Sequence, residues 1–224
     1  MVYASSRFAG YEAHYVGQLR PNTSQYGSPI QLATETGQVV QIFVHQRPSS
    51  FMAQNLERVF PDWVLPVTTC RVVVVLQQSR YPLADTAPHI EREKDRLRER
   101  LISFGCDVAR ALQKRGVLAD LIDPRTGYPL LSRLGEIPHD DTAVVNALLG
   151  FPVTTDKCSV LTHPSWGSAV YPGILMSSAS PSVIKPVLKK VAARQGWTAL
   201  KTDLQLSIAG VSTNENSLET VCEL

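Results

Sequence analysis

The run Arg71-Val72-Val73-Val74-Val75-Leu76 gives the clearest indication of how this chain folds. It is a short apolar run, rich in β-branched residues, with no polar position between its valines. Such a run is typical of a strand that is buried on both faces. It is far too short to cross a lipid bilayer as a helix. The stretch therefore predicts a core strand with the rest of the domain packed around it.

Before this strand, the sequence predicts a hairpin and a short helix. Residues 30–33 and 39–44 have the pattern of two strands, and residues 35–37 (Glu-Thr-Gly) suit the turn between them. Apolar side chains then recur at helical spacing over residues 52–60, after a pair of serines that can cap the helix. Pro61 ends this helix because it cannot continue the backbone hydrogen bonds.

After the strand, the sequence predicts one long helix over about residues 90–114, ended by Gly116. Its apolar positions are separated by three, four or seven residues, so they fall on one stripe. We expect its charges to form i,i+3 ion pairs on the solvent-facing side. The expected pairs are Glu91 with Lys94, Glu93 with Arg96, and Asp95 with Arg98.

The predicted helix is followed by a strand, a tight turn and a partner strand. The strand covers residues 117–122, and residues 128–131 return beside it. Between them lies Asp123-Pro124-Arg125-Thr126-Gly127. In such a turn the Asp side chain bonds its own backbone, Pro presets φ, and Gly takes a positive φ.

The remaining elements complete an α+β pattern. They are a helix between Asp140 and Gly150, strands over residues 160–162 and 169–176, and a helix capped by Ser182 with Pro186 in its first turn. Strands and helices in this mixed order favour an α+β fold with a mostly antiparallel sheet and flanking helices. We expect a globular domain over residues 29–202, an extended or poorly ordered arm over residues 1–28, and a tail over residues 203–224.

Composition limits the class of protein and of partner. The chain has 224 residues, of which 44% are hydrophobic and 19% charged, and a net charge of +2. These values are typical of a globular protein. The net charge is too small to argue for binding to nucleic acid or to an anionic membrane. The N-terminus lacks the pattern of a secretory signal, so disulfides are not expected either.

Residues 181–202 are locally basic, with no acidic residue among them. This pattern predicts either a solvated helix face or an electrostatic contact with an acidic partner. The cations are Lys185, Lys189, Lys190, Arg194 and Lys201.

The four cysteines contain no CxxC pair, so a structural zinc site is not expected. Cys70 and Cys106 fall at positions that predict plain buried residues, and Cys222 lies in the tail. Cys158 is different, because it stands shortly before a His-Pro-Ser-Trp-Gly segment. A thiolate there could bind a soft metal or attack a substrate, or the residue could have no functional role.

Two neighbours could tune this thiol. Lys157 could favour the thiolate electrostatically. His163 could orient or deprotonate the thiol, and Trp166 could form a flat wall or fill the core. These roles follow from residue type and position in the sequence alone.

Five pieces of sequence, in a fixed order and spacing, carry a resemblance to a known family. They are Ile90-Glu91-Arg92-Glu93, residues 119–127 (ADLIDPRTG), Leu149-Gly150-Phe151, Cys158, and His163-Pro164-Ser165-Trp166-Gly167. Over about residues 50–190, the chain resembles the CblD family of cobalamin-trafficking proteins, also called the methylmalonic aciduria and homocystinuria type D family.

The resemblance implies a nitroreductase-like fold without a flavin site, and a protein that is not an enzyme. It implies docking onto a cobalamin-loaded CblC-like partner, and routing of cobalamin to methionine synthase in the cytosol and methylmalonyl-CoA mutase in the mitochondrion. It also implies that Cys158 offers a thiolate to the cobalt of cobalamin. We expect a cytoplasmic location and leave a mitochondrial share open. The candidates for contact with cobalamin or the partner are Asp123, Lys157, His163, Ser165, Trp166 and Gly167.

Two enzyme hypotheses remain open beside this one. A Cys158–His163 pair could act as nucleophile and base. In an extended strand, however, five residues span roughly 16 Å, so direct contact would need a sharp turn. A flavin-dependent reductase of nitroreductase type would need phosphate-binding basic residues, of which the sequence shows no clear set.

Overall fold

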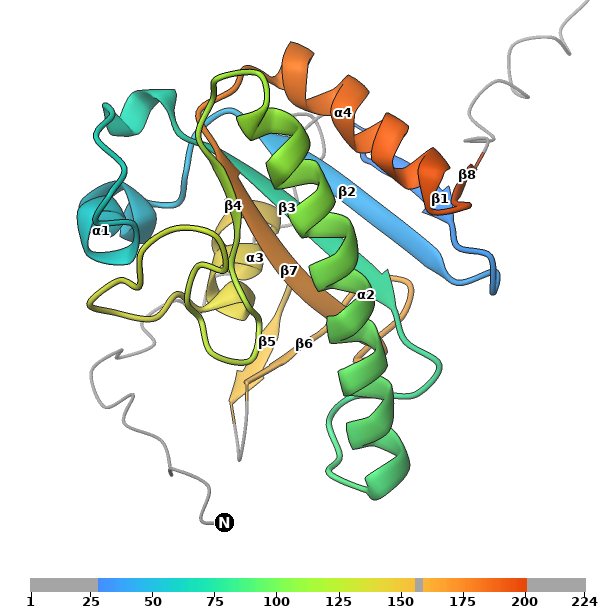
Figure 1. Cartoon of the computed structure of the whole chain (residues 1–224). Coiled ribbons are helices and arrows are strands. Elements are labelled where there is room, and N and C mark those ends of the chain that lie inside the picture. Colours follow the sequence, from blue (N-terminus) through green and yellow to red (C-terminus); the bar gives the residue numbers. More distant parts are fainter. Residues whose placement is uncertain (1–27, 156–158, 201–224) are drawn as a thin grey trace, which may run out of the picture.

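The computed structural model describes residues 28–155 and 159–200, which form a six-stranded sheet between two layers of helices (Figure 1). The strands of this sheet are β1 Ile30–Ala33, β2 Val39–His45, β3 Arg71–Gln78, β4 Ala119–Leu121, β7 Val170–Ser177 and β8 Thr198–Ala199. They lie in the order β4-β7-β3-β2-β1-β8, and all five neighbouring pairs are antiparallel. The predicted α+β fold with a mostly antiparallel sheet is therefore confirmed.

Strand β3 lies inside this sheet and is buried on both faces, as its sequence predicts. Val73 and Val75 belong to the core that contains helices α2 Pro88–Gln113 and α4 Pro181–Arg194. The alternate positions from Val72 to Leu76 belong to the core that contains α1 Ser50–Val59 and α3 Asp141–Leu149. Successive side chains of a strand point to opposite faces, so one apolar run supplies both cores.

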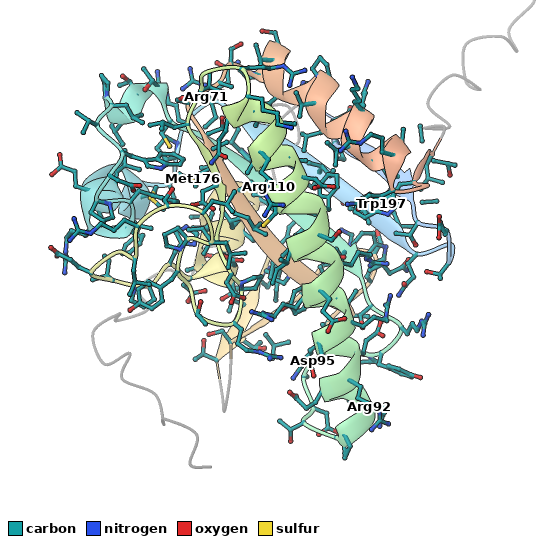
Figure 2. The ribbon with its side chains drawn as sticks, in the orientation of Figure 1. Arg71, Arg92, Asp95, Arg110, Met176 and Trp197 are labelled. Carbon is teal, nitrogen blue, oxygen red and sulfur yellow. The ribbon has the colours of Figure 1, made fainter. Side chains whose placement is uncertain are left out.

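Helices α2 and α4 cover the face of the sheet that is nearer in Figure 1. Trp197, which follows α4, stacks on Phe104 of α2 with 4.6 Å between the ring centres. Figure 2 shows Trp197 beside α2, below the end of α4. This aromatic pair holds the last helix and the edge strand β8 against the long central helix.

Glu93 of α2 corrects the expectation of a purely solvated charged face. Its carboxylate pairs with Arg96 as predicted, with 2.7 Å between Oε1 and Nη2, but only 4% of the Glu93 side chain is exposed. It also accepts the backbone N–H of Arg80 at 3.0 Å. A buried carboxylate needs such partners, because an unpaired charge in the interior is costly. The Glu93 side chain therefore points toward the loop after β3, and not into solvent. Among the described residues, no helix is long and apolar enough to cross a membrane.

The structure contains a second, two-stranded sheet that was not predicted from the sequence. Strands β5 Val153–Thr155 and β6 Ser159–Leu161 pair with Thr155 opposite Ser159. The prediction of a strand near residues 160–162 is confirmed, whereas β5 is a strand that was not predicted. The missed signal is the run Val153-Thr154-Thr155, because β-branched residues favour extended backbone.

The predicted strand over residues 128–131 is also wrong, apart from one bridge between Ile122 and Pro129. The buried Asp120 carboxylate accepts the backbone N–H groups of Leu131 and Ser132, at 3.0 and 2.6 Å. These amides are therefore bound by a side chain and do not join a strand ladder.

Helix α4 begins earlier than predicted. Its cap residue is Ser180, not Ser182, so Pro186 lies inside the helix and not in its first turn. The Ser180 and Ser182 hydroxyls bond each other at 2.7 Å. The inward face is as predicted, with Ile184 and Leu188 fully buried.

Candidate functional site

A cavity with a volume of about 380 Å³ lies where three segments of the described chain meet. The segments are the turn over residues 124–127, residues 138–142 at the start of α3, and strand β6. Such a volume is at the lower end of small-molecule sites, which enclose about 300–1,000 Å³. The cavity therefore brings the predicted turn to the strand that follows Cys158.

The turn is fixed to α2 by an ion pair. Asp123 accepts from Arg98 Nε and Nη2 at 2.7 and 2.6 Å, and only 4% of its side chain is exposed. Burial raises the pKa of Asp123, but the Arg98 hydrogen bonds and charge outweigh it and hold the pKa below its usual range. The predicted Asp95–Arg98 pair does not form, because Asp95 instead binds Arg125 of the turn. The two parallel hydrogen bonds between Arg98 and Asp123 make this ion pair strong and fix its geometry.

Gly127 closes the turn and touches the second segment. Its carbonyl accepts the backbone N–H of His139 at 2.7 Å, and its φ is +73°. A Cβ atom at this position would lie 2.6 Å from the His139 carbonyl oxygen. Only glycine fits here, because the backbone is left-handed and the neighbouring chain is too close.

His139 and Asp141 form a buried pair in the cavity wall. The distance between Nδ1 and Oδ1 is 3.1 Å, and the exposed fractions of the two side chains are 1% and 5%. Burial raises the pKa of Asp141, and the hydrogen bond from His139 only partly offsets this effect. Within the described residues, His139 Nε2 and Asp141 Oδ2 have no hydrogen-bond partner. Sequence analysis predicted only the beginning of a helix in this segment, and no local pattern pointed to the pair.

Cys158 and Lys157 lie outside the described residues. The ends of their segment are fixed, since Thr155 pairs with Ser159 between β5 and β6. Ser159, directly after Cys158, lines the cavity together with Leu161. The described residue next to Cys158 is thus part of the cavity wall.

His163 is buried and bonded through both ring nitrogens. Nδ1 accepts the N–H groups of Ser165 and Trp166 at 3.1 and 3.2 Å. The neutral ring therefore carries its proton on Nε2, which donates to Gln41 Oε1 at 3.2 Å. Burial lowers the pKa of His163 to about 4. With both nitrogens engaged, His163 has no free lone pair with which to act as a base for a thiol.

The other residues of the His-Pro-Ser-Trp-Gly segment form a tight loop. His163 and Gly167 exchange backbone hydrogen bonds of 2.8 and 2.9 Å, and Gly167 has a φ of +56°. Trp166 is half-buried and stacks on His163 with 3.9 Å between ring centres, and Ser165 is exposed. Residues 163–167 therefore form a compact loop that is stabilised by its own hydrogen bonds and is exposed at Ser165. Among the described residues, the cavity is lined by Ser168 and not by residues 163–167.

The two described cysteines are buried, as predicted. Burial raises the pKa of the Cys70 thiol to about 12 and also raises that of Cys106. Neither can supply a thiolate near neutral pH. In the described parts of the chain, no cluster of His, Cys, Asp or Glu could hold a metal ion by itself.

Comparison with known proteins identifies the family. The model of the family "Methylmalonic aciduria and homocystinuria type D protein" matches residues 8–191, a range that begins well before the resemblance expected from the sequence. Cobalamin trafficking protein CblD of Homo sapiens is 23% identical over 191 residues, which cover 84% of this chain and 63% of the human protein. CblD of Gallus gallus is 24% identical over 142 residues, or 63% of this chain and 47% of that protein.

A third relative is also similar, and all three matches cover only part of the relative's length. CblD of Rattus norvegicus is 25% identical over 130 residues, or 58% of this chain and 43% of that protein. The chain thus spans less than two thirds of the length of these curated relatives. The family match nevertheless covers most of the chain and includes the turn, the cavity, Cys158 and the loop at His163. This chain belongs to the methylmalonic aciduria and homocystinuria type D protein family.

Proposed function

We propose that this chain is a cobalamin-trafficking adaptor in which the Cys158 thiolate binds the cobalt of cobalamin. The family supports a role in cobalamin trafficking, since its curated members carry that name. Cobalt can drive the deprotonation of a thiol that binds it, and a thiolate is a suitable soft donor. The protein then acts by ligation and docking, and no catalytic step is assigned to it.

The observation that carries this proposal is the position of Ser159 in the cavity wall. Cys158 is its neighbour in the chain, and the β5–β6 pairing holds both ends of the segment that contains it. A ligand in this cavity would meet the turn over residues 124–127, the start of α3 and Ser159, the residue that follows Cys158. Lys157 would favour the thiolate by its charge.

The other cysteines support the choice of Cys158. Cys70 and Cys106 are buried, and their thiol pKa values are raised. Cys222 lies outside the family match over residues 8–191. Cys158, by contrast, lies within the family match, and Ser159, the residue that follows it, lines the cavity.

The size of the cavity favours a shared ligand. Drug-sized molecules already need about 300–1,000 Å³, and cobalamin, a corrin with a nucleotide tail, is much larger than such molecules. A cavity of about 380 Å³ cannot enclose it. We therefore propose that the corrin lies between this protein and a CblC-like partner, with edge contacts from this side.

The remaining parts of the proposal concern fold, route and place. The antiparallel sheet with helices on both faces is compatible with a nitroreductase-like fold that has lost its flavin site. Cobalamin passes from the complex to methionine synthase in the cytoplasm, and to methylmalonyl-CoA mutase where a mitochondrial pool exists. A flavin-containing, yellow purified protein would contradict the adaptor role.

Complex formation tests the proposal. Wild-type protein, Cys158→Ser and Cys222→Ser are each sedimented with a cobalamin-loaded CblC-like protein, and the cobalamin absorbance is followed. We expect wild type and Cys222→Ser to sediment together with cobalamin and partner, and Cys158→Ser to bind more weakly. Absence of any complex with the wild-type protein would refute the adaptor role. Equal binding of all three proteins would remove Cys158 from it.

A further inference from the structure

A basic groove lies on the side of the molecule formed by α2 and α4, in a part of the chain separate from the cavity. Its volume is about 260 Å³. Its cations are Arg110, Lys114 and Arg115 from α2 and the residues after it, and Lys190 and Arg194 from α4. All five are exposed. Figure 2 marks Arg110 on the upper half of α2.

These charges are almost uncompensated by the described residues. Asp107 is the acidic residue of the groove lining, and it lies 3.9 Å from Arg194. The floor between the cations is apolar and includes Ala111, Val187 and Val191. An acidic segment with an apolar side would match both features, because opposite charges attract and the floor offers apolar contact.

The chain itself contains such a segment outside the described residues. Residues 203–224 have four acidic residues and no Lys or Arg. Glu215, Glu219 and Glu223 are four residues apart, with Leu218 and Cys222 at neighbouring helical positions. In a helix, this spacing would set the carboxylates about 6 Å apart in one row.

The cations of the groove have the same spacing. Arg110 of α2 and Lys114, the residue directly after α2, are four residues apart, and Lys190 and Arg194 are four residues apart on α4. A helical segment in the groove could therefore align carboxylates with either row. We propose that residues 215–224 bind this groove within the same molecule and cover it.

The connection is long enough for this contact. Arg194 lines the groove, and Leu200, the last described residue, follows only a short strand later. Residues 201–214 can span roughly 46 Å at about 3.3 Å per residue. The whole of α2 is about 39 Å long at 1.5 Å per residue. A short linker also raises the effective concentration of the segment to about the millimolar range, so modest affinity suffices.

The consequence is a covered docking surface. An acidic segment of another protein can use the groove only when it displaces residues 215–224. The contact weakens with salt, because the screening length falls from about 10 Å at 0.1 M to about 3 Å at 1 M ionic strength. This inference does not depend on the role of Cys158.

A nitroxide label tests the proposal in the full chain. Ser217→Cys carries the label in a background of Cys158→Ser and Cys222→Ser. Cys70 and Cys106 stay unlabelled because both are buried. We expect the amide NMR signals of Ala111 and Val191 to weaken with the oxidised label and to recover after its reduction. Signals from α1, on the other face of the sheet, stay unchanged.

Charge variants decide the cause of this effect. Replacing Glu215, Glu219 and Glu223 with Gln removes it, and so does Lys190→Glu with Arg194→Glu. The matched control is Lys185→Glu with Lys189→Glu, which changes the same charge on α4 outside the groove and keeps the effect. No weakening in the labelled protein, or equal weakening after the three Gln substitutions, would overturn the proposal. The first of these results would leave the groove to an acidic segment of a partner.

Discussion

At the scale of single residues, Gly127 controls how the turn meets the start of α3. We expect Gly127→Ala to lower the free energy of unfolding by about 2–5 kcal/mol. The left-handed backbone costs a non-glycine residue about 1–2 kcal/mol, and overpacking against His139 adds about 1–3 kcal/mol. Urea unfolding measures the loss.

Gly150 provides the matched control. It has a φ of +68° at the end of α3, but a Cβ there would meet no atom within 4 Å. Gly150→Ala should therefore cost only the backbone part, about 1–2 kcal/mol. Equal losses in the two variants would show that the turn yields to the new methyl group and that the close approach is unimportant.

His163 predicts a pH dependence of stability. Burial lowers the pKa of the folded-state ring from 6.5 to about 4. Between pH 4 and 6.5, His163 is protonated in the unfolded chain but neutral in the folded protein. The contribution of His163 to the free energy of unfolding is therefore fully present above pH 6.5 and is lost as the pH falls toward 4. The contribution of one histidine is at most about 1.4 kcal/mol per pH unit. Chemical unfolding at several pH values measures this slope.

The variant His163→Asn isolates the effect, because asparagine does not titrate. We expect its stability to fall less steeply than that of wild type between pH 6.5 and 4. His45, whose pKa burial also lowers to about 4, keeps its own share of the slope in both proteins. An unchanged slope in His163→Asn would mean that the ring is accessible to protons in the folded state.

At the scale of elements, Arg98 connects α2 to the turn before α3. Arg98→Met removes both hydrogen bonds to Asp123 and leaves a buried carboxylate without its cation. Breaking a buried ion pair from one side costs about 3–5 kcal/mol, and Arg98 is one-quarter exposed, so we expect about 3 kcal/mol. Denaturant unfolding followed by circular dichroism measures the change.

Arg92 is the control on the same helix. It is exposed near the N-terminal end of α2, where Figure 2 shows it beside Asp95. Arg92→Met should change stability by no more than about 0.5 kcal/mol, as for most surface substitutions. A small loss for Arg98→Met, similar to that for Arg92→Met, would mean that the turn is held mainly by its own backbone.

Elements with a strong periodic pattern could be predicted from the sequence. Strand β3, helix α2 and the hairpin β1–β2 follow from local patterns that their packing reinforces. Residues 128–131 could not be predicted, because the Asp120 carboxylate binds their amides from another segment. The inward position of Glu93 depends likewise on the amide of Arg80, which is distant in sequence and near only in the fold.

At the scale of the whole molecule, the sheet brings three distant segments to one cavity. The sequence predicted the turn over residues 123–127 and singled out Cys158. It could not predict the buried His139–Asp141 pair, since its two residues look like part of a helix cap. It also left His163 undecided, and only the contacts with Gln41, Ser165 and Trp166 reveal a structural histidine. The whole fold is therefore needed to separate the supporting residues from the proposed ligand.

The visible absorption spectrum of cobalamin tests whether Cys158 binds cobalt. Cobalamin bound to a CblC-like partner is mixed with this protein or with its Cys158→Ser variant, and Cys222→Ser serves as the control. We expect a new spectrum of a cobalt–thiolate species with wild type and with Cys222→Ser, and its loss with Cys158→Ser. The same new spectrum with Cys158→Ser, or no new spectrum from a wild-type complex that does form, would contradict the claim that Cys158 binds cobalt.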